Sequence, residues 1–310
     1  MDKTPAQVIQ TGNIGDLALL TASTLGFWPA ESLTLVSLRG PRRRSGLIAR
    51  VSLDDLAAKP EAVDILIHHL QQNQATTVVL IVWSDTLTPE AAAALAEPVA
   101  LAMLAADLPS EVATIRNGAI HQHGCDQGCC ASARPLPTDS PTAAALVSAG
   151  MAVLPDRQAL IDSVNGTPVS HDAVANATPA DVLAWLEAAA AFIAHPGATL
   201  SDQQAADLLL SAQSIKTRDR LISSSVAGQV PLELLLHLAQ RAHPEHQGVY
   251  GALAMSAWLS GRLILAEAAI DHLPAENTLG RLLAQTIALS IPPMEQAEWL
   301  RNNGDTLTSP

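Results

Sequence analysis

The run Thr76 to Trp83 constrains the fold of this chain more than any other segment. It is rich in β-branched side chains and contains no charged residue. A strand of this kind has no polar face to turn toward water, so it is expected to be covered on both faces. The apolar run around it, Ala75 to Trp83, is far shorter than the roughly 20 residues of a membrane-spanning helix. The segment therefore predicts a buried strand in a soluble α/β unit.

Strand and helix patterns alternate on both sides of this run, which is typical of a mixed α/β domain. Two short strands precede it and form a predicted hairpin, because only a short loop rich in Gly, Pro and Arg separates them. Prolines begin two of the predicted helices, and Pro98 is expected to kink or split the second. The expected elements are a helix over 15–25, strands over 33–38 and 47–53, and helices over 60–72 and 89–108.

Asn117-Gly118 is the clearest local signal in the chain. Asn-Gly between two short strand-like runs, 112–116 and 119–123, predicts a hairpin with a two-residue type I′ turn. Such a turn pairs 116 with 119, 115 with 120, 114 with 121 and 112 with 123. One face of the hairpin then carries Ala113, Ile115 and Ile120, and the other carries Thr114, Arg116, His121 and His123.

Strand patterns end near Pro155, and helical patterns follow to the end of the chain. We therefore predict an α/β N-terminal domain with a mixed central sheet over 1–154, and an all-α C-terminal domain over 155–310. The predicted helices are 179–194, 201–212, 216–225, 231–242, 248–259, 262–272, 278–289 and 293–301.

The segment 252–289 resembles one tetratricopeptide-like helix hairpin. Small residues such as Gly261 and Ala266 recur where two helices of such a hairpin approach closely. A generic helix pair explains the same spacing equally well, because stable arrays of this repeat need about three copies or more.

The formal charge of −13 disfavours broad contact with nucleic acid or an anionic membrane. The N-terminus shows no secretory signal, and an odd number of cysteines argues against a disulfide framework. These features predict a cytoplasmic protein. The many Ala and Leu residues on helices favour a protein partner or self-association.

All three cysteines lie in one short segment beside two histidines: His121, His123, Cys125, Cys129 and Cys130. Thiolate and imidazole are the ligands that zinc prefers, and the separation of Cys125 from Cys129 is within the spacing of structural zinc sites. Gly124 and Gly128 would allow the loop to wrap around an ion. The cluster therefore makes zinc the candidate cofactor, with these five residues as candidate ligands.

Two other interpretations of the cysteines stay open. Most zinc folds use two separated ligand pairs, and the side chains of adjacent Cys129 and Cys130 diverge, so the thiols could instead pack beneath a helix over 142–150. Cys125 could also form a redox pair with either of the other two. Reactivity of that kind requires a lowered thiol pKa, and the nearest basic residue in the sequence is Arg134.

Asp85 is a further candidate, because it follows the buried strand at its carboxyl end. Ligands of open α/β sheets bind at that edge. The alternative, which we favour, is that Asp85 caps or turns the chain before Pro89. His243 and His246 flank a Pro-Glu turn and are expected to lie on the surface.

Several of these segments together resemble an uncharacterised actinobacterial family, domain of unknown function 4192. No single segment is decisive, but their order is specific and covers nearly the whole chain. The resemblance implies a fold in outline and no known activity. The segments that carry it are Gly15 through Leu33, Thr77 to Trp83 with Asp85, Cys125 with Cys129-Cys130, Ala144 to Leu154 with Ala159-Leu160, and Ala257 to Gly261.

These observations favour a non-catalytic binding or assembly module. In this interpretation the helical half binds a protein partner, as stacked helix hairpins do, and the cysteine loop is structural. The alternative is a metal- or thiol-dependent enzyme that uses the cluster from His121 to Cys130, with Asp85 near the cleft. A catalytic zinc keeps an open coordination position, whereas a structural zinc does not.

Overall fold

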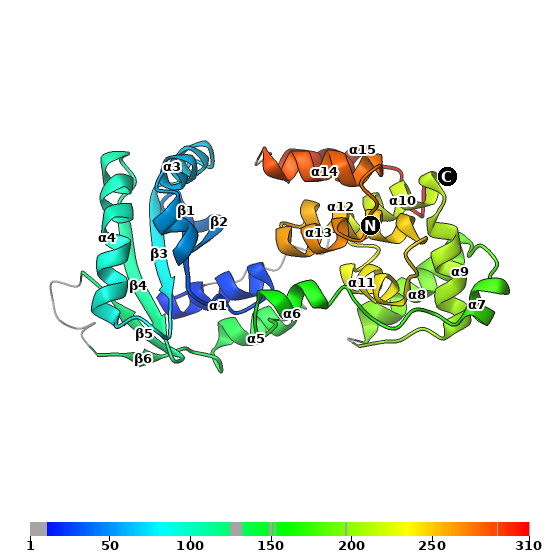
Figure 1. The fold of residues 1–310 in the computed structure, drawn as a ribbon, viewed down its shortest axis with the longest axis horizontal. Helices are drawn as coiled ribbons and strands as arrows, with labels where there is room; N and C mark the ends of the chain where they lie inside the picture. The colour runs from blue at the N-terminus through cyan, green and yellow to red at the C-terminus, as the bar shows by residue number, and fades with distance from the viewer. Residues whose placement is uncertain are drawn as a thin grey trace. The chain divides into compact units, whose positions relative to one another are not determined.

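The computed structural model describes residues 11–124, 132–148, 151, 153–195, 197–289 and 291–309. The chain divides into two compact units, Met1–Asp156 and Arg157–Pro310 (Figure 1). The first contains the described strands, and the second is helical. The predicted order, a mixed α/β half followed by an all-α half, is therefore confirmed.

The first unit is built on one sheet with the strand order β2-β1-β3-β4-β5-β6. Only the β3–β4 pair is parallel, and the other neighbours are antiparallel, so the sheet is mixed. The strands are β1 (Ser32–Arg39), β2 (Arg44–Ser52), β3 (Thr77–Trp83), β4 (Ser110–Arg116), β5 (Ala119–Gln122) and β6 (Arg134–Pro135). The unit's helices are α1 (Ile14–Leu25), α2 (Leu53–Ala58), α3 (Ala62–Gln72), α4 (Pro89–Ala105) and α5 (Pro141–Ser148).

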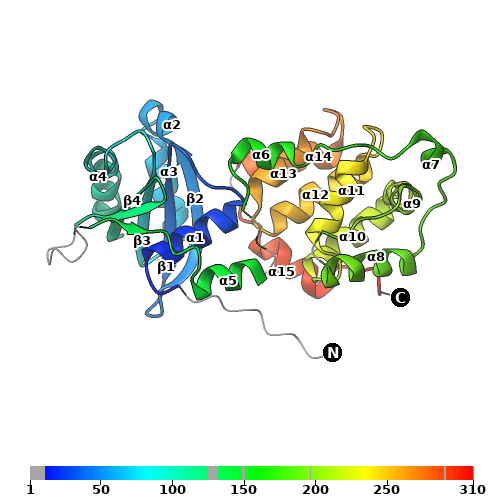
Figure 2. The same ribbon diagram turned by 90° about the horizontal axis from the view of Figure 1, so that it is seen from below.

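Strand β3 lies between β1 and β4 and is buried on both faces, as its composition predicts. On one face Val78, Leu80 and Val82 pack with α2, α3 and α4. On the other face Val79 and Ile81 pack with α1 (Figure 2). Because side chains alternate along a strand, each face needs its own helical cover.

Both predicted hairpins are present. Strands β1 and β2 pair antiparallel, and β4 and β5 pair in the expected register, with Arg116 opposite Ala119 and Thr114 opposite His121. Asn117 and Gly118 have φ of 48° and 71°, the positive values that a type I′ turn requires.

Pro98 does not split α4, so the prediction of a split is wrong. The helix runs without a break from Pro89 to Ala105, and Pro98 lies on its exposed side. The buried residues Ala92, Ala96, Val99 and Met103 anchor the opposite side in the core. Tertiary packing thus offsets the one backbone hydrogen bond that proline removes.

The second unit contains ten helices among its described residues. Their bounds are α6 (Arg157–Asp162), α7 (His171–Ala175), α8 (Val182–Ala194), α9 (Asp202–Ala212), α10 (Ile215–Val226), α11 (Leu232–Arg241), α12 (Gln247–Leu259), α13 (Leu263–Ile270), α14 (Thr278–Ala288) and α15 (Met294–Asn303). The eight predicted helices correspond to α8 through α15. Helices α2, α6 and α7 were not predicted, because segments of six residues or fewer are too short to show helical periodicity.

Helix α12 is central to the helical unit. Nearly all of its side chains are buried, and it contacts α9, α10, α11, α13, α14 and α15. It also packs closely on α13, to which it is joined through Gly261 at a φ of 76°. This contact is equally expected of a generic helix pair, so the tetratricopeptide-like hairpin stays a prediction.

No helix within the described part of the chain is long and apolar enough to cross a membrane.

Candidate functional site

A pocket of about 430 Å³ lies at the carboxyl ends of β3 and β4 in the first unit. Because these two strands are parallel and pair Trp83 with Ile115, both end at the same edge of the sheet. This edge is where open α/β sheets bind ligands, and the volume is in the range of small-molecule sites. The pocket is lined by Trp28, Pro29, Ala30, Glu31, Trp83, Ser84, Asp85, Ile115, Gly118, Leu136 and Thr138.

Two tryptophans form the aromatic part of this pocket. Trp83 ends β3 and is buried, and its indole Nε1 donates a hydrogen bond to Thr34 Oγ1 at 2.9 Å. Trp28 is half-buried and follows Gly26, which ends α1 at a φ of 85°. The ring centroids are 6.3 Å apart at an interplanar angle of 55°. Trp28 is therefore the more exposed of the two tilted indole rings that line the pocket.

Glu31 connects the segment before β1 to the segment after β3. Its carboxylate accepts hydrogen bonds from Ser84 Oγ at 2.9 Å, Thr86 Oγ1 at 3.0 Å and the backbone N–H of Asp85 at 3.3 Å. Glu31 has a φ of 42°, in the left-handed region that non-glycine residues rarely adopt. Backbone strain of this kind is concentrated at functional sites, so the position of Glu31 supports a functional pocket.

Asp85 does not cap α4, so the capping half of the alternative that we favoured is wrong, although Asp85 does lie in the bend over 85–87 that precedes Pro89. The N-cap of α4 is Thr88, whose side chain accepts from the backbone N–H of Ala91. Asp85 Oδ1 instead accepts from the backbone N–H of Asn117 at 2.6 Å and so holds the β4–β5 turn beside the pocket. Asp85 thus lies at the carboxyl edge of the sheet and lines the pocket, as expected if it belongs to a ligand site.

His121 and His123 lie on the sheet face opposite to Ile115 and Ile120, as predicted. His123 Nε2 is 2.8 Å from Thr114 Oγ1. Burial lowers the pKa of His123, and the neighbouring His121 lowers it further. Both histidines also lower the pKa of Glu90, although hydrogen bonds from its own backbone N–H and from Thr88 have larger effects.

The remaining candidate ligands, Cys125, Cys129 and Cys130, lie outside the described residues. Within the described ranges, no group of three or more His, Cys, Asp or Glu side chains could hold a metal ion. The five-residue zinc site therefore stays a prediction.

A family model matches residues 15–294, which include the whole pocket lining. Its description is Domain of unknown function (DUF4192). This chain belongs to the DUF4192 family. The family that the sequence analysis named is therefore confirmed. Searches of curated proteins and of solved structures give no match.

The tryptophan pocket of this DUF4192 chain was missed by sequence reasoning, except for Asp85. Its lining comes from four segments: the end of α1, the end of β3, the β4–β5 hairpin and the segment after β6. One signal was available. Aromatic residues make up only 3% of the chain, yet Trp28 lies in the segment between α1 and β1 and Trp83 is the last residue of β3.

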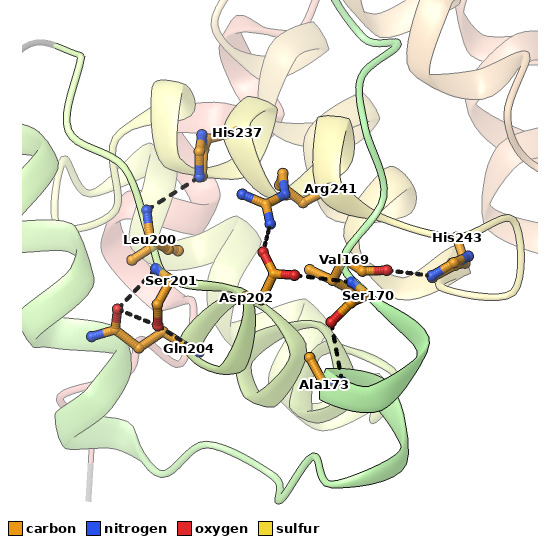
Figure 3. Close-up of polar contacts among 10 residues, drawn as sticks. All are labelled: Val169, Ser170, Ala173, Leu200, Ser201, Asp202, Gln204, His237, Arg241 and His243. Atoms are coloured by element: carbon orange, nitrogen blue, oxygen red, sulfur yellow. Dashed lines mark hydrogen bonds and ion pairs between the residues drawn. The ribbon is translucent and has the colours of Figure 1, made fainter.

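A second polar cluster of the DUF4192 chain lies in its helical unit (Figure 3). Asp202, in the first turn of α9, pairs with Arg241 of α11 and accepts from the backbone N–H of Ser170 at 3.1 Å. The hydrogen bonds from Ser170 are the main reason that the pKa of Asp202 is lowered. Nearby, His243 Nε2 lies 2.9 Å from Val169 O. These contacts join three segments of one unit, which supports a structural role.

His246 is buried, so its predicted surface position is wrong. It is 6% exposed, and its Nδ1 accepts the backbone N–H of His243 at 3.0 Å. Burial lowers the pKa of His246; the charge of Glu245 opposes this effect, and His243 adds to it. A Pro-Glu turn in the sequence suggests exposure, but the turn packs its second histidine inward.

We expect the helical unit to lose stability as the pH falls below about 6.5, the ordinary pKa of histidine. Because folding lowers the pKa of His246, the unfolded chain binds this proton at a higher pH than the folded chain does. The contribution of His246 to stability is therefore complete above the ordinary pKa of histidine, and it is lost as the pH falls through the folded-state pKa. Urea unfolding at a series of pH values measures this. His246→Asn, whose side-chain oxygen can still accept the His243 N–H, should show a weaker pH dependence. An identical dependence in both proteins would contradict the assignment.

Proposed function

We propose that this protein is a non-catalytic binding module that takes a small organic ligand in the tryptophan pocket of its first unit. The observation that carries this proposal is the pocket itself, with two indole rings and two carboxylates at the carboxyl edge of β3 and β4. Small-molecule sites combine an apolar lining with a few fixed polar groups in this way. The odd number of cysteines supports a reducing compartment such as the cytoplasm.

The hydrogen bonds of Ser84 support a binding role over catalysis. Its Oγ donates to the Glu31 carboxylate and accepts from the backbone N–H groups of Thr86 and Leu87 at 3.2 and 3.0 Å. A hydroxyl oxygen has two lone pairs, and both are engaged here. These contacts hold Ser84 and Glu31 in a fixed arrangement beside the pocket, which suits a binding site.

We expect Trp28→Ala to reduce ligand affinity by about tenfold or more, because a large aromatic contact surface is lost. A panel of small metabolites would first be screened for compounds that raise the melting temperature of the full chain. Ligand at about 100 times its Kd stabilises a protein by about 2.7 kcal/mol, which such a screen detects. Titrations followed by tryptophan fluorescence would then compare the variant with the wild type.

Trp299→Ala is the matched control, since Trp299 is 61% exposed and lies on α15 of the other unit. It should leave the affinity unchanged. Ligand recovered chemically intact after long incubation would support the non-catalytic role. Failure to find any compound whose binding depends on Trp28 would refute the proposal.

A second proposal concerns the cysteine loop, where the common face of His121 and His123 favours metal binding. We expect elemental analysis to find about one zinc per chain, and Cys125→Ser to lose the zinc and melt at a lower temperature. His68→Ala, which changes a histidine on α3, is the control and should retain the metal. Absence of zinc, together with unchanged melting of Cys125→Ser, would exclude both the structural and the catalytic zinc site. Zinc whose removal unfolds the protein would favour the structural version.

A further inference from the structure

We infer that the ligand of the tryptophan pocket carries a positively charged organic group, an ammonium or a guanidinium. This inference rests on the proposed function, since it specifies the ligand of the same pocket. It follows from the charge of the pocket, the identity of its aromatic residues and its size.

The pocket lining contains two carboxylates, those of Glu31 and Asp85, and no basic side chain among the described residues. The hydrogen bonds to Glu31 all come from neutral donors. Asp85 Oδ1 accepts a backbone N–H, while Arg116 Nε donates to the main-chain oxygen of Asp85 at 3.4 Å. Neither carboxylate forms a salt bridge within the described part of the chain. The lining is therefore suited to a cation.

The aromatic residues favour the same kind of ligand. Tryptophan binds cations on its ring face more strongly than tyrosine or phenylalanine does. Trp28 and Trp83 line the pocket together with Glu31 and Asp85, and the two indole rings are tilted by 55° to each other. Aromatic rings combined with carboxylates are the usual binding arrangement for organic ammonium groups.

The size and chemistry of the pocket favour an organic cation over a metal ion. Hard metal ions require about six converging oxygen ligands, and no metal-holding group of acidic or histidine side chains occurs within the described residues. A volume of about 430 Å³ is large for a bare ion, and Ile115 and Leu136 offer apolar contact to the carbon part of a ligand. The net charge of −13 would also attract cations at long range.

The test is a fluorescence titration of the full chain with tetramethylammonium, choline, agmatine and spermidine, each beside a neutral analogue of similar shape, such as 3,3-dimethyl-1-butanol for choline. We expect at least one cation to bind about tenfold or more tightly than its analogue. The double variant Glu31→Gln, Asp85→Asn keeps an oxygen acceptor at each position and removes the charge. It should lose most of this preference, whereas Glu187→Gln, an exposed charge change on α8, should not.

Melting curves of each variant establish that it is folded. The inference is overturned if none of the four cations binds, or if the neutral analogues bind as tightly. Screening neutral and anionic compounds as well separates the proposed binding function from the inference that the ligand is a cation. If binding that depends on Trp28 is found only for neutral or anionic compounds, the cation inference is overturned and the binding function still holds. No Trp28-dependent ligand of any class overturns both.

Discussion

Gly248→Ala is expected to lower the free energy of unfolding by about 3 kcal/mol, the upper part of the range for overpacking a core. Gly248 lies in the first turn of α12, where an added Cβ would collide with the backbone oxygen and carbon of Ala212 at the end of α9. Backbone atoms cannot rotate away as a side chain does. The collision would therefore displace α12, which contacts at least six other helices of its unit. Urea unfolding followed by circular dichroism measures the effect.

Gly251→Ala is the matched control in the same helix. Its Cβ would meet the end of the flexible Leu279 side chain, with Cδ2 at 3.1 Å, and no backbone atom of another helix at close range. Alanine is favoured over glycine in a helix by about 1 kcal/mol, which offsets a small side-chain shift. We therefore expect little change in stability. Equal urea midpoints for the two variants would show that α9 and α12 do not approach as closely as described.

Thr34→Val is expected to destabilise the first unit by about 2 kcal/mol, since a buried donor without a partner costs 1–3 kcal/mol. The valine would have a similar shape but would leave the Trp83 Nε1–H with no acceptor in the core. Trp83→Phe would also be destabilising, because the smaller phenylalanine ring would leave part of the buried space of the indole unfilled. The double variant should be less destabilised than the sum of the two single variants, because it removes donor and acceptor together. Thermal and urea unfolding of all four proteins gives this coupling.

Thr21→Val serves as the control for the loss of a buried hydroxyl. Thr21 Oγ1 donates to Leu17 O within α1 and accepts no hydrogen bond from the described residues, so its removal leaves none of their donors unsatisfied, and the cost should be clearly smaller. The Thr34 variant should also weaken ligand binding, because its hydroxyl holds the Trp83 ring at the pocket. Strictly additive effects of Thr34→Val and Trp83→Phe would argue against the hydrogen bond.

The family was correctly predicted from the order of several segments along the chain. The order of the two halves was correctly predicted because it depends on patterns within short stretches of sequence. The run 77–83 has no polar face, so it had to be a covered strand. Asn117 and Gly118 tolerate the positive φ of their turn, and a two-residue turn leaves only one register for β4 and β5. The helices α8 to α15 follow from periodicity and from capping residues such as Ser201, which forms a capping box with Gln204.

The candidate site was predicted only in fragments. The common face of His121 and His123 followed from strand alternation, and Asp85 from its place after a buried strand. The place of Trp28 and Glu31 in the pocket could not be predicted, because no pattern in the neighbouring sequence indicates that the segment before β1 contacts the segment after β3. The burial of His246 was likewise decided by packing around its turn.

By itself, therefore, the sequence determined the longer strands and helices and how one hairpin is paired. Only the tertiary structure decided that β3 and β4 run parallel, that Pro98 is tolerated in α4, and that four separate segments enclose one pocket. The physical reason is the range of the interactions. Backbone preferences and side-chain periodicity act over a few residues, whereas Glu31 reaches Ser84 and Thr86 across 53 and 55 positions of chain, and only packing brings such groups together.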